Sequence, residues 1–105
     1  MTETEWLNCH EPDYLLEEVE GQVSREKLVE FVRRCWDHIK RFLPPVETTV
    51  TVVEEFAALA PTQSDHDAVL YADEASLKAA RWAPDLKGER AWQSDLFRKL
   101  VPRPK

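Results

Sequence analysis

Two pairs of side chains that bind zinc in proteins occur in the first half of this sequence. Cys9 and His10 are adjacent, and Cys35 and His38 are three positions apart, a spacing that places both on one face of a helix. Thiolate sulfur and neutral imidazole are the usual ligands of zinc, so the four side chains together match a Cys2His2 site. Such a site would make the protein a metal-binding domain or a small metal-dependent enzyme.

A packing role explains the same four residues more simply. Cys35 lies at the centre of an apolar helix face, where a free cysteine behaves as a small hydrophobic residue, and His38 lies at the edge of that face. Cys9 and His10 point in different directions on a helix because they are adjacent. We therefore expect that the ligand atoms do not converge and that the protein binds no cofactor, with the metal site as the alternative.

A second group of polar side chains, at residues 64–67, has the sequence Ser-Asp-His-Asp. Carboxylates beside an imidazole suit a metal ion or general base catalysis. The group also stands at the start of an expected helix, where acids complement the positive end of the helix dipole. No phosphate-binding glycine loop, G-x-S-x-G or H-E-x-x-H motif accompanies it. We assign no catalytic residue, and a protein that is not an enzyme is favoured.

The helix expected at residues 24–43 is the element around which the fold is organised. At 3.6 residues per turn its apolar side chains form one continuous arc, and every charged side chain lies outside that arc. The arc consists of Phe31, Phe42, Cys35, Leu28, Ile39, Val32, Leu43, Trp36 and Val29. Ser24 suits the N-cap position, and Pro44 and Pro45 are expected to end the helix.

The remaining segments also follow helical periodicity. We expect short helices within residues 3–20, then helices at 46–60, 64–83 and 88–101. Residues 48–53 are rich in β-branched side chains, but a single strand would have no partner to pair with. The prediction is a single all-α domain over residues 1–105, a compact bundle of about four to five helices.

Composition restricts the cellular setting. Hydrophobic residues make up 43% and charged residues 32% of the chain, and the two cysteines are too few for a disulfide framework. No apolar run is long enough to span a bilayer, and the acidic first residues do not resemble a signal peptide. We therefore predict a cytoplasmic protein without a membrane role.

The net charge of −6 is unevenly distributed along the chain. Residues 1–24 contain seven acidic and no Lys or Arg side chains, and the acidic and basic segments that follow alternate. These segments are expected to neutralise one another across the bundle surface. As an alternative, one acidic face docks a basic partner. Nucleic-acid binding is disfavoured, because the basic positions are few and interleaved with acids.

The helix expected at residues 64–83 has two different faces. One is rich in alanine, which permits close helix packing, while Leu70 and Leu77 form a narrow stripe nearly opposite. We expect the helix to be sandwiched between two others. As the alternative, the stripe is exposed and, with Trp82 nearby, forms a binding surface for a protein partner or for a second copy of the chain.

The opening residues 2–9, T-E-T-E-W-L-N-C, resemble a family of small bacterial all-helical domains of unknown function that open T-E-x-E-W-L-x-C. The resemblance extends over most of the chain. It includes Lys27, Leu28, Phe31, Cys35 and Ile39, the V-V-E-E-F-A run at 52–57 and the helix at 89–96. It implies an all-helical fold and no function. Members of the family carry a cysteine cluster where this chain keeps only Cys35, so a metal or redox role is not implied here.

These observations predict a small non-catalytic helical interaction or regulatory module with an unknown protein partner. Two alternatives remain open. One is the metal-binding domain or small metal-dependent enzyme that uses the four Cys and His residues. The other is an acidic immunity-type inhibitor that neutralises a basic protein.

Overall fold

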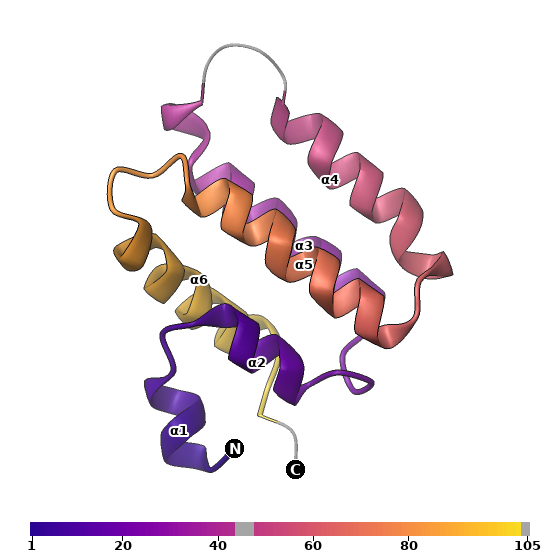
Figure 1. Cartoon of the computed structure of the whole chain (residues 1–105), viewed down its shortest axis with the longest axis vertical. Coiled ribbons are helices and arrows are strands. Elements are labelled where there is room, and N and C mark those ends of the chain that lie inside the picture. The colour runs from indigo at the N-terminus through magenta and orange to yellow at the C-terminus, as the bar shows by residue number, and fades with distance from the viewer. Residues whose placement is uncertain (44–47, 104–105) are drawn as a thin grey trace.

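The computed structural model of the chain describes residues 1–43 and 48–103. Within these residues the chain forms six α-helices and no strand, as Figure 1 shows. The helices are α1 (Glu3–Asn8), α2 (Pro12–Glu18), α3 (Arg25–His38), α4 (Thr48–Leu59), α5 (Asp65–Ala80) and α6 (Leu86–Leu100). Two short 3-10 turns, η1 (Lys40–Phe42) and η2 (Ala60–Thr62), follow α3 and α4. The predicted all-α class is confirmed.

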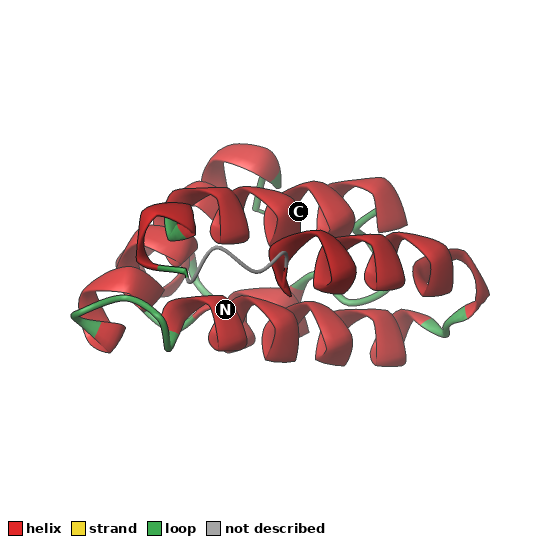
Figure 2. Ribbon diagram, turned by 90° about the horizontal axis from the view of Figure 1, so that it is seen from above, coloured by secondary structure: helices red, strands yellow, loops and turns green. Residues whose placement is uncertain are grey.

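The centre of the bundle is α3. It contacts α4, α5 and α6, and its most extensive packing is against α5. Figures 1 and 2 show the helices in two layers, with α5 lying over α3 and with α4 and α6 on either side of this pair. Within α3 the apolar arc expected from the sequence is the buried face of the helix, except for the half-buried Val29, and Cys35 and Trp36 are buried as predicted.

Close packing between α3 and α5 depends on the alanine-rich face of α5. Five alanines of this helix are buried in the core: Ala68, Ala72, Ala75, Ala79 and Ala80. Small side chains let the two helix backbones approach, so that the large apolar side chains of α3 fill the interface. Arg25, in the first turn of α3, pairs with Asp65, in the first turn of α5, so the two helices run in the same direction.

Three helix starts have the caps that the sequence predicts. The Oγ1 of Thr2 accepts a hydrogen bond from the Glu5 backbone N–H at 3.1 Å, and the Glu5 side chain accepts one from the Thr2 N–H at 3.0 Å. The Oγ of Ser24 accepts from the Lys27 N–H at 3.2 Å, and that of Ser64 accepts from the Asp67 N–H at 3.1 Å. Each cap satisfies N–H groups that lack a partner within the helix.

Several helix ends differ from the expected bounds. The helix expected at 24–43 ends at His38, because Ile39 leaves helical geometry and Phe42 donates to the Ile39 carbonyl in the tighter η1 turn. The short helices expected within 3–20 are present as α1 and α2, whereas α5 ends at Ala80, three residues before the expected position. α6 begins at Leu86, two residues earlier than expected. The described residues do not include Pro44 and Pro45, nor residues 46 and 47 of the segment expected at 46–60.

Two arginines join elements that are far apart in sequence. Arg98 of α6 donates to the carbonyl oxygens of Trp6 and Cys9 at 3.0 and 2.6 Å, which satisfies the end of α1. Arg25 donates to the carbonyl oxygens of Ala60 and Gln63 at 3.1 and 2.9 Å, which fixes the connection between α4 and α5. In the part of the chain that the structure describes, no helix is both long and apolar enough to cross a membrane.

Candidate functional site

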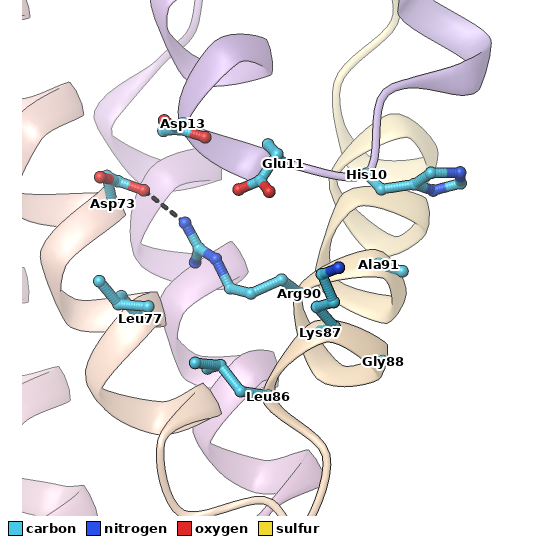
Figure 3. Close-up of a pocket in the computed structure, with 10 residues that line it drawn as sticks. All are labelled: His10, Glu11, Asp13, Asp73, Leu77, Leu86, Lys87, Gly88, Arg90 and Ala91. Carbon is cyan, nitrogen blue, oxygen red and sulfur yellow. Dashed lines mark hydrogen bonds and ion pairs between the residues drawn. The ribbon is translucent and has the colours of Figure 1, made fainter.

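A cavity with a volume of about 590 Å³ lies between α2, α5 and α6. We call it the α2–α5–α6 cleft (Figure 3). Its lining residues are His10, Glu11, Asp13, Asp73, Leu77, Leu86, Lys87, Gly88, Arg90 and Ala91. Sites that bind small molecules typically have volumes of about 300 to 1,000 Å³, so the cleft is of a size to hold a ligand group.

Short-range sequence features place these residues. Pro12 occupies the first turn of α2, so the residues on either side of it, Glu11 and Asp13, stand at the start of that helix. Asp73 and Leu77 are four positions apart and therefore share one face of α5. The first turns of α6 supply the remaining wall from Leu86 to Ala91.

A buried polar network forms the wall of the cleft between α5 and α6. Arg90, only 7% exposed, donates to Asp73 Oδ1 at 2.7 Å and to Ser76 Oγ and Gln93 Oε1, each at 2.9 Å. Gln93 Nε2 donates in turn to the Ser76 carbonyl oxygen at 2.8 Å. The charge of Arg90 is thus neutralised by Asp73 within the protein, and its orientation is fixed by the other two contacts.

The two acids on the α2 side of the cleft, Glu11 and Asp13, are not paired as Asp73 is. One carboxylate oxygen of Asp13 is buried from solvent and has no hydrogen-bond partner among the described residues. The Glu11 carboxylate points into the cleft, and no hydrogen bond or ion pair joins it to another lining residue (Figure 3). The folded protein therefore leaves one acceptor of Asp13 unsatisfied, and burying such an oxygen costs free energy.

Apolar side chains line the side of the cleft away from these acids. Leu77 is half-buried, and Leu86 is 44% exposed. In Figure 3 the two leucines lie together on the opposite side of Arg90 from Glu11 and Asp13. The exposed ammonium of Lys87 stands on the α6 wall. The cleft therefore offers an apolar surface and two acidic groups within one cavity.

The predicted binding residues are only partly brought together. Leu77 lines the cleft, whereas Leu70, 47% exposed, and Trp82, 44% exposed, are not among its lining residues. The expectation that α5 is sandwiched with its leucine stripe buried is wrong for Leu70. Of the ten residues that line the cleft, sequence analysis named His10 and Leu77 and missed the other eight, which include Glu11, Asp13 and Leu86.

The four residues of the proposed zinc site have separate roles. The Cys9 thiol donates to the Glu11 carbonyl oxygen at 3.2 Å, and the ring of His10 points away from the cleft (Figure 3). Cys35 is fully buried in the core, while the His38 ring pairs with Glu89. Over residues 1–43 and 48–103, no group of three or more His, Cys, Asp or Glu side chains is arranged to hold a metal ion.

Cys35 lies in an environment that suppresses its reactivity. Burial raises the pKa of its thiol well above 9.0, the nearby Glu89 adds to this effect, and Arg90 opposes it. A nucleophilic or metal-binding cysteine needs its thiolate, and this environment disfavours the thiolate. Cys35 is therefore a packed core residue.

Residues 64–67 also have structural roles. Ser64 caps α5, and Asp65 pairs with Arg25. His66 Nδ1 lies 2.7 Å from Glu20 Oε1, so the imidazole joins α5 to the residues that follow α2. These contacts account for the group without a metal ion or a catalytic role.

The fold and the cavity define a small all-α bundle with a cleft among three of its helices. No protein-family model, curated protein or solved structure matches this chain. The resemblance of residues 2–9 to small bacterial helical domains stays a prediction.

Proposed function

We propose that this protein is a small interaction module that binds a partner polypeptide through the α2–α5–α6 cleft. The observation that supports this proposal is the pairing of an apolar surface, Leu77 and Leu86, with the acidic side chains of Glu11 and Asp13 in one cavity. Buried anchors of protein interfaces are apolar or amphipathic side chains that fill such a pocket, while polar groups around them fix orientation.

The proposal is tested by selecting a displayed library of random dodecapeptides against the wild-type protein. Enriched peptides are then measured against Leu86→Asp, which places a charge on the apolar wall. Because Leu86 is 44% exposed, the variant is expected to fold. Leu7→Asp is the matched control, since Leu7 is 58% exposed and lies on α1 outside the cleft.

We expect peptides that bind the wild type and Leu7→Asp equally and that bind Leu86→Asp at least about tenfold more weakly. If no peptide is enriched, or if Leu86→Asp binds as well as the control, the proposal is wrong. Sedimentation equilibrium of the protein alone identifies the remaining candidate partner. A dimer that dissociates in Leu86→Asp and persists in Leu7→Asp would mean that a second copy of the chain occupies the cleft.

A further inference from the structure

We infer that the cleft accepts a basic side chain, an arginine or a lysine, of the partner polypeptide, with the carboxylates of Glu11 and Asp13 as its acceptors. The inference rests on the proposed function and adds the chemistry of the ligand. It follows from three features of the cleft: its unpaired acids, its apolar wall and the charge of the surface around it.

The acids of the cleft differ in whether they have an ion-pair partner. Asp73 and Arg90 neutralise each other at 2.7 Å, so Glu11 and Asp13 are the acids of the cleft without an ion pair to any described residue. The buried oxygen of Asp13 has no donor among the described residues, and a cationic N–H group is the strongest donor that a carboxylate can receive. A guanidinium or an ammonium group would be attracted by the negative charge of the two carboxylates.

The apolar wall fits the rest of such a side chain. Arginine and lysine carry an aliphatic stem that packs on apolar surface while the charged end reaches a polar partner. Leu77 and Leu86 lie across the cleft from the two acids, so the stem would contact these leucines when the charged end meets the carboxylates. An acidic side chain in the same position would meet two like charges.

The α2 side of the cleft has the same sign of charge as the two acids. Residues 1–24, which form α1 and α2, contain seven acids and no Lys or Arg. Glu18 pairs with the N-terminal ammonium and Glu20 with His66, so α2 keeps Glu11, Asp13 and the exposed Glu17 for a partner. Such a surface attracts a basic segment and repels an acidic one.

Lys87 opposes the binding of a cation because its ammonium lies on the α6 wall. Its side chain is exposed and makes no hydrogen bond or ion pair with the other lining residues. Lys87 therefore provides a second test, in which the affinity for a cation should change in the opposite direction. Removing the charge with Lys87→Met should strengthen the binding of a cationic ligand, whereas removing the charges of Glu11 and Asp13 should weaken it.

The test titrates two matched probes into isotopically labelled protein and follows the amide resonances of cleft residues. The probes are n-butylguanidinium, which has the aliphatic stem and charge of arginine, and n-butylurea, which has nearly the same shape and no charge. The proteins are the wild type, Glu11→Gln/Asp13→Asn and Lys87→Met. Glu17→Gln is the control, because it removes a charge from α2 outside the cleft.

We expect the guanidinium to bind the wild type and Glu17→Gln at least about tenfold more tightly than the urea. The double variant should lose this preference, and Lys87→Met should increase it. Equal binding of both probes, or unchanged guanidinium binding in the double variant, would overturn the inference. So would the absence of any shift in the cleft. The peptide selection decides the proposed function separately, because it enriches any peptide that binds the cleft, whatever the charge of that peptide.

Discussion

The imidazole of His38 pairs with the carboxylate of Glu89, with 2.6 Å between Nδ1 and Oε2. Glu89 is only 7% exposed, because it lies where α6 packs against α3. The His38 ring also stacks on Trp92, with the ring centroids 3.5 Å apart. A residue that the sequence presents as a zinc ligand therefore serves as the partner of a buried carboxylate.

This relationship predicts a large effect of a single substitution. His38→Ala leaves Glu89 buried without a donor and should lower the free energy of unfolding by about 1 to 3 kcal/mol. The control is His10→Ala, an exposed histidine whose loss should change stability by less than about 0.5 kcal/mol. Urea unfolding measures both. Equal stability of the two variants would show that the pair contributes nothing.

A comparison of two aspartates separates a binding role from a structural one. Asp73→Asn removes the charged partner of the buried Arg90 and should cost about 2 kcal/mol or more. Asp13→Asn removes a carboxylate that has an unsatisfied buried oxygen, so its stability should stay within about 1 kcal/mol of the wild type. Thermal and urea unfolding provide the values. If Asp13→Asn were the more damaging change, Asp13 would be a structural residue.

Thiol labelling tests the position of Cys35. A thiol reagent should modify at most one cysteine per native molecule, the half-buried Cys9, and should reach Cys35 only after unfolding. The Cys9→Ser variant identifies the reactive residue, because its native form should then show no rapid reaction. Rapid modification of native Cys9→Ser would mean that the apolar face of α3 is accessible.

The raised pKa of Cys35 makes the free energy of unfolding decrease at alkaline pH. Below about pH 9 both the folded and unfolded states hold the thiol proton, so the full stability is present. Above this pH the unfolded state releases the proton while the folded state retains it, and stability falls as pH rises. Burial and nearby Glu55 raise the pKa of Tyr71 from 10.0, which adds a similar loss at higher pH.

The slope of this loss for Cys35 is at most about 1.4 kcal/mol per pH unit. Urea unfolding of the wild type and Cys35→Ala from about pH 8 to 10 should show the steeper decline in the wild type. Parallel declines would indicate that the thiol ionises as readily in the folded protein as in the unfolded chain.

Most of the fold could be predicted because its signals are local. The periodicity of the α3 face and the caps at Thr2, Ser24 and Ser64 each involve residues within a few positions of one another. The end of α3 could not be predicted, because the change to a 3-10 turn at Ile39 depends on how that buried side chain packs.

Much less of the site could be predicted, because the cleft is formed by three helices that are separate in sequence. The leucine stripe of α5 identified Leu77 as a candidate. Asp73 lies four positions from Leu77 on the same face of α5, and only the packing of α6 shows that it holds Arg90. A local signal was present in α6, since Arg90 and Gln93 interrupt its apolar face three positions apart.

The most direct test of the central claim is the position of a bound cationic probe. Nuclear Overhauser contacts between n-butylguanidinium and the wild-type protein should connect the butyl protons to the methyl groups of Leu77 and Leu86. They should be absent in Glu11→Gln/Asp13→Asn at the same probe concentration. Contacts confined to other surfaces, such as that around Leu70 and Trp82, would contradict the account.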